Sequence, residues 1–241
     1  MDLKIRVLAI AIGLGCFAAT ASAVTTTDAT FNSVSPGATF NYNLNGSGGS
    51  TTAGTFNWTG TSGGSINLGN FTAFCIELTQ TISTGSNYAY NVDPLQNGPN
   101  PNPMGSTKAT EIEELWAKYF SSIFIGTPAQ QQQNAAAFQI CVWDLEYGSV
   151  LSTTSSLDLA SGTFYATNLS DPDVVQAQTQ LAYIASLGGT GAVANLVALD
   201  NPSNQDMVTA SPAVPEPVTA SLSTLGLGGL ILLALRRRRH A

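Results

Sequence analysis

Histidine is nearly absent from this sequence. The only one is His240, the second-last residue of the chain. A Ser-His-Asp triad, a Cys-His protease and a His-ligated zinc site each need a histidine within the folded domain. We therefore exclude these three kinds of site for the part of the chain that precedes the C-terminal segment.

Positive charge is also scarce. The chain has eight Lys and Arg against 15 Asp and Glu, and six of the eight lie in the first 23 or the last 28 residues. Two acidic residues lie in those ends as well, so the central part keeps Lys108 and Lys118 against 13 acids, a net charge of −11. Such a surface repels phosphate backbones, and nucleic acid is not an expected partner.

The first 23 residues have the pattern of a secretory signal. Lys4 and Arg6 precede an apolar run from Val7 to Ala19, and Ala21-Ser22-Ala23 resembles a cleavage site. The apolar run is short for a membrane anchor, which is the alternative reading. We predict that residues 1–23 direct export, so that the rest of the chain acts outside the cytoplasm.

The last 28 residues (214–241) combine three features. Val218 to Leu235 is apolar and predicts a C-terminal transmembrane helix, and a basic cluster follows it. A short proline-containing motif precedes it. The motif is Val214, Pro215, Glu216 and Pro217, and the cluster is Arg236, Arg237, Arg238 and Arg239.

In this order the three features resemble the PEP-CTERM sorting signal of Gram-negative bacteria. The resemblance implies recognition and processing by an exosortase, a transient anchor in the inner membrane and delivery to the cell surface or the extracellular matrix, where such proteins occur in biofilms. The alternative, an ordinary membrane anchor, predicts no processing. Three linked features would then have to coincide by chance, so we favour the sorting signal.

The central chain predicts an α+β domain over residues 24–200 and a linker over residues 201–213. Alternating apolar residues predict strands at 40–44, 56–58 and 66–68, with a hairpin loop at 46–54. The segment 71–82 is more continuously apolar, which predicts a more central strand, and further strands are predicted at 88–92 and 196–199. Helical spacing predicts a helix that begins at a Thr110–Glu113 capping box, a second over about 130–147, and a third capped by Asp171 and ended by Gly188. We expect an antiparallel β-sandwich or barrel with a helical subdomain.

Two cysteines remain after the signal, Cys75 and Cys141, since Cys16 lies within it. A disulfide between them is one interpretation for an exported protein. The predicted helix offers another, because Gln139 lies in the middle of its apolar run and a buried amide needs a partner. Two residues apart on a helix means about 200° of rotation, so Gln139 and Cys141 point to nearly opposite faces. Cys75 can meet one of them but not both.

Two motifs favour Gln139 as the partner. Phe74-Cys75-Ile76-Glu77 resembles the aromatic-Cys-apolar-acid motif of bacterial surface thioester domains, and residues 138–143 resemble their second motif, which contains a Gln and a Trp. The resemblance implies a bond between Cys75 and Gln139, shielded by Trp143, in a surface protein that captures its target covalently. The 64 residues that separate Cys75 from Gln139 are fewer than in the larger members, and Cys141 replaces a usual Ala.

Without histidine, proton transfer falls to Glu77, another carboxylate, water or the backbone. On a strand Glu77 would share a face with Cys75, although a solvated carboxylate is the simpler interpretation. A thioester reacts once, so we do not expect an enzyme, and no cofactor or metal is predicted. The target is a nucleophile on a surface, a polysaccharide or a protein. The alternative is a non-covalent structural or carbohydrate-associated matrix protein, with the cysteines in a disulfide or free.

Overall fold

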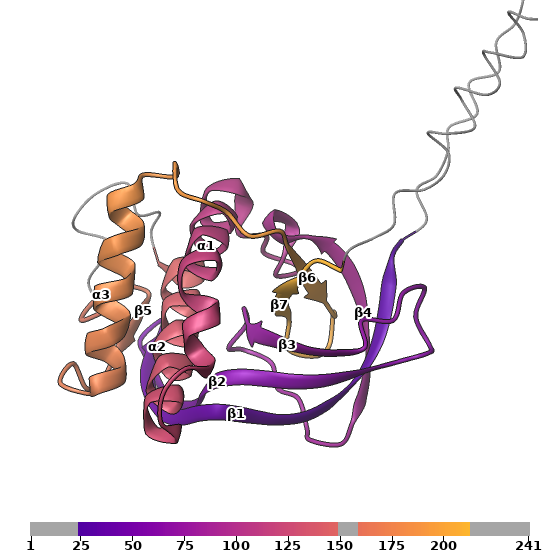
Figure 1. Cartoon of the computed structure of the whole chain (residues 1–241), viewed down its shortest axis with the longest axis horizontal. Coiled ribbons are helices and arrows are strands. Elements are labelled where there is room, and N and C mark those ends of the chain that lie inside the picture. The colour runs from indigo at the N-terminus through magenta and orange to yellow at the C-terminus, as the bar shows by residue number, and fades with distance from the viewer. Residues whose placement is uncertain (1–23, 149–158, 213–241) are drawn as a thin grey trace, which may run out of the picture.

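The computed structural model describes residues 24–148 and 159–212, a mixed α+β fold with a large antiparallel sheet, as the sequence predicts. Its elements are β1 (Thr26–Leu44), β2 (Ser47–Thr61), β3 (Asn70–Cys75), β4 (Asn87–Pro94), η1 (Leu95–Asn97), α1 (Gly105–Tyr119), η2 (Phe120–Phe124), α2 (Pro128–Tyr147), β5 (Phe164–Ala166), α3 (Pro172–Leu187), β6 (Leu196–Asp200) and β7 (Met207–Ala210). The helices gather at one end of the molecule and most of the sheet lies at the other (Figure 1).

The sheet closes on itself through the pairing of β1 with β2. Its order is β2-β3-β7-β6-β4-β1-β5, and β1 pairs in addition with β2. The first part of β1 therefore has β4 on one side and β2 on the other. The last part of β1 pairs with β2 and with the short β5. This closure leaves the central strands without an open edge.

The β1–β2 hairpin differs from the prediction. Residues 47–54 of the expected loop are strand, and the turn is Asn45-Gly46, with φ of 53° and 82°. Positive φ at both central residues is typical of a type I′ turn, for which Asn-Gly is a preferred pair. The Gly, Ser and Thr of this segment continue the ladder because β1 provides a partner along its whole length.

Three other strand predictions need correction. The segment 71–82 is strand only as far as Cys75, and Ile66 makes a single bridge to Thr27 in place of a strand. The expected linker at 201–213 contains β7, which lies between β3 and β6 in the sheet. The predicted strands at 88–92 and 196–199 are confirmed as β4 and β6.

The helices follow the prediction except at one start. Thr127 and Gln130 form a capping box on α2, Asp171 caps α3, and Gly188 ends α3 with a left-handed φ of 57°. The prediction of a capping box at Thr110 is wrong. The helix α1 begins before Thr110, at Gly105, and has no side-chain cap.

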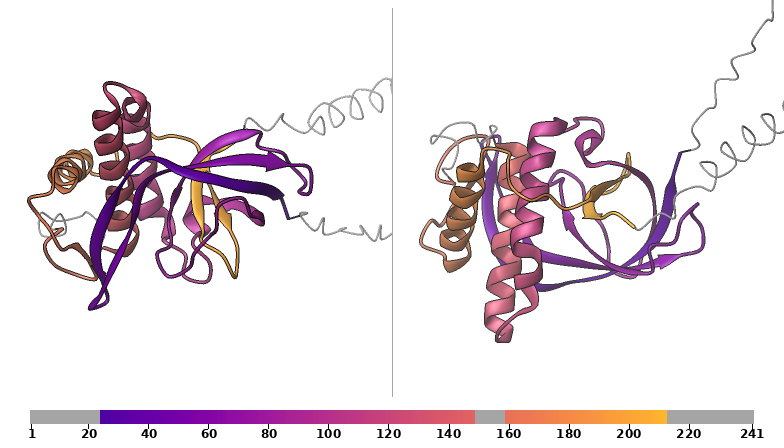
Figure 2. Two further views of the ribbon diagram at one scale, coloured as in Figure 1. Left: turned by 90° about the horizontal axis from the view of Figure 1, so that it is seen from below. Right: turned by 45° about the horizontal axis from the view of Figure 1, so that its top comes forward.

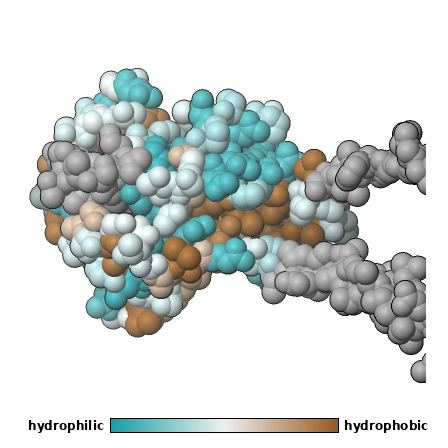
Figure 3. All heavy atoms as spheres, turned by 90° about the horizontal axis from the view of Figure 1, so that it is seen from above, coloured by the Kyte–Doolittle hydropathy of each residue, from teal (hydrophilic) through white to brown (hydrophobic). Residues whose placement is uncertain are grey.

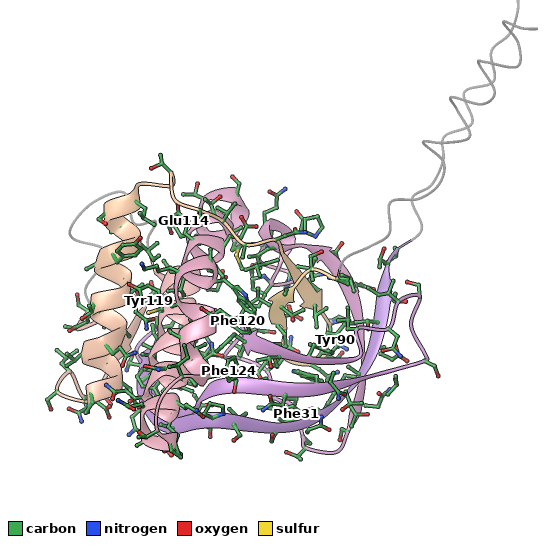
Figure 4. The ribbon with its side chains drawn as sticks, viewed as in Figure 1. Phe31, Tyr90, Glu114, Tyr119, Phe120 and Phe124 are labelled. Carbon is green, nitrogen blue, oxygen red and sulfur yellow. The ribbon has the colours of Figure 1, made fainter. Side chains whose placement is uncertain are left out.

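Two groups of side chains make up the core. Inside the sheet the Trp58 ring lies 5.1 Å from Phe31 and 5.7 Å from Tyr90, and Figure 4 places Phe31 and Tyr90 among the strands. At the other end every residue of α2 from Ala135 to Glu146 is buried. The reason is the position of this helix: α2 packs against β1, β2 and both other helices, and the right view of Figure 2 draws it between α3 and α1. A helix apolar all round is typical of such a central position.

In residues 24–148 and 159–212 no helix is long and apolar enough to cross a membrane. The expected signal, the sorting motif with its transmembrane helix and the arginine cluster lie outside these residues. The two ends of the described chain leave the molecule at the sheet end, away from α3 (Figures 1 and 2). On the face drawn in Figure 3, hydrophobic surface forms a band at that end between hydrophilic regions.

Candidate functional site

The Gln139 side chain pairs with the backbone of Cys75. The Cys75 N–H donates to Gln139 Oε1 at 2.9 Å, and Gln139 Nε2 donates to the Cys75 carbonyl at 2.8 Å. The ladder between β2 and β3 ends at Phe56 and Ala73, so Cys75 lies beyond its reach. On its other side Cys75 pairs with Met207 of β7. The amide of Gln139 thus takes the place that a residue of β2 would hold.

The Cys75 thiol lies in the same buried region. Cys75, Gln139 and Trp143 are each 0 % exposed. Cys75 Sγ donates to the Glu77 carbonyl at 2.8 Å and accepts from the Glu77 N–H at 3.3 Å. The Gln139 carboxamide, which is bonded to the Cys75 backbone, and the Cys75 thiol therefore both lie at the end of β3, away from water.

Electrostatics keep this thiol protonated. Burial raises the pKa of Cys75 to about 12, while the nearby Trp143 side chain and the Glu77 backbone oppose the rise. The Trp143 N–H favours a thiolate although it makes no hydrogen bond of ordinary geometry. Its ring is fixed by Phe40 and Phe164, with centroids at 6.0 and 6.3 Å. Trp143 thus lies in an aromatic cluster beside the sulfur.

Glu77 differs from the prediction. Because β3 ends at Cys75, the two residues do not share a strand face. The Glu77 carboxylate accepts from Thr79 Oγ1 at 2.5 Å, and its carbonyl accepts from Gln205 Nε2 at 2.8 Å. Glu77 is 8 % exposed, so it is not a solvated surface acid either. Its hydrogen bonds with the thiol are made by its backbone.

Cys141 faces α3. Its Sγ lies 3.3 Å from the Ala177 carbonyl and 3.4 Å from Gln180 Oε1. Both Cys75 and Cys141 are free and buried. The disulfide that the sequence left open is therefore wrong, since the two sulfurs lie on different sides of α2.

Several residues around the site were not predicted. Tyr147 Oη accepts from the Leu78 N–H at 2.7 Å, which fixes the chain just after the Cys75 motif. Asp206 accepts from the Asn201 N–H at 2.6 Å and from the Asn100 N–H at 2.9 Å. The only sequence signal was indirect: polar residues at 201–206 next to apolar ones at 207–208 could have indicated a buried turn and a strand.

Within the described part of the chain, no group of three or more His, Cys, Asp or Glu is arranged to hold a metal ion. What the site offers is one thiol, one carboxamide and their fixed hydrogen bonds.

No family model, curated protein or solved structure matches this chain.

Proposed function

We propose that this is an exported surface or matrix protein that forms a thioester between Cys75 and Gln139 and uses it to attach to a nucleophile. The observation that carries the proposal is the double hydrogen bond between the Gln139 carboxamide and the Cys75 backbone. Holding an amide against the residue that bears the thiol supplies the proximity that a poor electrophile needs.

Bond formation would follow from these contacts. Cys75 Sγ attacks Gln139 Cδ, and negative charge develops on Oε1, which already accepts from the Cys75 N–H. Since burial raises the pKa of Cys75 to about 12, the resting form is the thiol. Its proton passes to Nε2 as the C–N bond breaks, and ammonia leaves. The thiol and the amide thus become a thioester and ammonia, with no outside acid or base consumed.

In the capture step the sulfur would be the leaving group, whereas in bond formation it is the nucleophile. An amine or hydroxyl of the target attacks the Gln139 carbonyl, an amide or ester forms, and Cys75 leaves and regains a proton. The burial of both residues protects the bond from water, so the target has to gain entry before it reacts. The protein reacts once, and we therefore do not regard it as an enzyme.

Methylamine tests this proposal. We expect the purified protein to incorporate one methylamine at Gln139 and to gain one thiol, at Cys75, which peptide mapping would locate. Cys75→Ala should incorporate none. Cys141→Ala is the matched control, because it removes the other buried thiol and should react as the parent does. Incorporation that persists in Cys75→Ala, or none in the parent, would contradict the proposal.

Export and sorting belong to the same proposal. Residues 1–23 would be removed on export. The C-terminal membrane helix would then anchor the α+β domain in the inner membrane until an exosortase acts near 214–217. The sheet of this domain would form a sandwich or barrel. The test is the mass of the C-terminal peptide of the surface protein: an unprocessed end that extends through Arg236–Arg239 would exclude processing.

A further inference from the structure

A groove lies beside β3. It has a volume of about 490 Å³, and residues of β1, β2, β3, α1, η2 and β7 line it. This volume is in the range of small-ligand sites, about 300–1,000 Å³. We call it the β3 groove and define it by Asn32, Asn57, Asn70, Phe71 and Phe120.

The lining of the β3 groove carries no charge. All of its side chains are amides, hydroxyls, aromatic rings or alanine. A second groove, of about 440 Å³, includes the carboxylates of Asp93 and Glu113. An uncharged groove on a domain with a net charge of −11 selects against anionic ligands. It offers nothing to pair with a cationic one.

Two of its three amide side chains are held in place by hydrogen bonds. Asn32 Nδ2 donates to Thr59 Oγ1 at 3.0 Å, and Asn57 Nδ2 donates to the Ser35 carbonyl at 2.6 Å. Asn70 is exposed at the start of β3. Side-chain amides both donate and accept, which suits a ligand with many hydroxyl groups. Fixed amides lose little entropy when such a ligand binds.

Aromatic rings complete the groove. Phe71 stacks on Trp58 with an angle of 4° between the rings, and Phe120 stacks on Trp116 at 4.3 Å. Phe71 and Phe120 are only partly buried. Figure 4 places Phe120 between the helices and the sheet. Apolar ring surface beside fixed amides matches a sugar, which presents C–H groups on one face and hydroxyls at its edge.

A peptide fits less well. β3 already pairs with β2 and β7, so the groove has no free strand edge to which an extended peptide could add. A helical peptide needs an apolar groove, and this one is rich in amides and hydroxyls.

We propose that the β3 groove binds a short segment of a neutral polysaccharide. This goes beyond the proposed thioester and does not depend on it. If the thioester also forms, the groove would hold a hydroxyl-bearing polymer beside the strand that ends at Cys75, which lies four residues and about 13 Å along the strand from Phe71.

Titration calorimetry of the purified protein tests this inference. The probes are neutral hexasaccharides of glucose, mannose and galactose, with hexagalacturonate as the anionic comparison. We expect at least one neutral hexasaccharide to bind and the anionic one not to bind. Asn32→Ala with Asn70→Ala should weaken binding about five- to tenfold, the equivalent of one or two lost hydrogen bonds. Both positions are exposed, so folding should persist, and the urea midpoint checks this.

Gln96→Ala is the matched control, because Gln96 is an exposed amide in the second groove. It should leave binding unchanged. Cys75→Ala should also bind normally, which separates this inference from the thioester. The inference is overturned if no neutral hexasaccharide binds, if hexagalacturonate binds equally, or if the double variant binds as tightly as Gln96→Ala.

Discussion

At the scale of single residues, Gln139 satisfies two backbone groups that no strand reaches. Burying a backbone N–H or C=O without a partner costs about 1–3 kcal/mol for each group. Gln139 pairs both groups of Cys75 from the middle of a helix whose neighbouring residues are all buried. The unreacted amide therefore has a structural role, and its bond from Nε2 to the Cys75 carbonyl is lost if ammonia leaves.

Gln139→Leu should destabilise the protein by about 2–4 kcal/mol, because it leaves both groups of Cys75 unpaired. Urea denaturation with a fixed m-value measures the loss. Gln132→Leu is the control on the same helix, where the side chain is exposed, and it should change stability by less than about 0.5 kcal/mol. Equal effects of the two substitutions would contradict the assigned contacts.

Part of this site was predictable from helix geometry. The rotation between Gln139 and Cys141 indicated that only one could face Cys75, and the two side chains indeed contact β3 and α3 respectively. The contact of Gln139 with the Cys75 backbone was not predictable, because it depends on where β2 leaves β3. The role of the Glu77 backbone depends in the same way on β3 ending at Cys75.

At the scale of elements, β1 and β2 approach each other closely at two paired glycines, Gly37 and Gly54. A Cβ on Gly54 would lie 2.4 Å from the Pro36 carbonyl and 2.5 Å from Gly37 Cα. Both are backbone atoms, which a side-chain rotation cannot move. Both strands also pack against α2.

Gly54→Ala should therefore cost about 2–3 kcal/mol in unfolding free energy, near the upper range for overpacking. Gly48→Ala is its control in the same strand, since a Cβ there would meet only the Tyr42 carbonyl, at 4.0 Å. We expect that control to fall within about 0.5 kcal/mol of the parent. Thermal or urea unfolding checks both, and a tolerated Gly54→Ala would show that the strands lie farther apart.

Local sequence predicted the elements that carry their own signals. Caps and periodicity located α2 and α3, and alternation located β4 and β6. It failed where a partner decides the structure. Residues 47–54 are rich in Gly and Ser yet form a strand because β1 pairs with them. The four residues of β7 form a strand because they pair with β3 and β6.

At the scale of the whole molecule, buried carboxyl groups couple stability to pH. Burial raises the pKa of Glu146 to about 8, against the opposing effect of Lys108. Burial and the charge of Asp206 raise the pKa of Asp200 to about 7, and burial raises that of Asp206 to about 6. In the unfolded chain such groups titrate near 4. Between about pH 4 and 8 the native state therefore holds protons that the unfolded state has released.

Stability should fall as pH rises through this window, because the native state binds more protons. We expect the free energy of unfolding at pH 5 to exceed that at pH 8 by about 2–4 kcal/mol. Asp200→Asn should flatten part of this dependence, since the amide keeps the shape without the ionisation. Urea unfolding at a series of pH values measures it, and a stability that is higher at pH 8 would contradict these assignments.

The intact mass of the freshly purified protein tests the central claim most directly. If Cys75 and Gln139 form a thioester, the chain is lighter than its sequence by one ammonia, and Cys75→Ala restores the full mass expected for that variant. A parent protein with the unmodified mass under mild conditions, with both Cys75 and Cys141 open to alkylation after denaturation, would contradict covalent capture and leave Gln139 as a structural bridge.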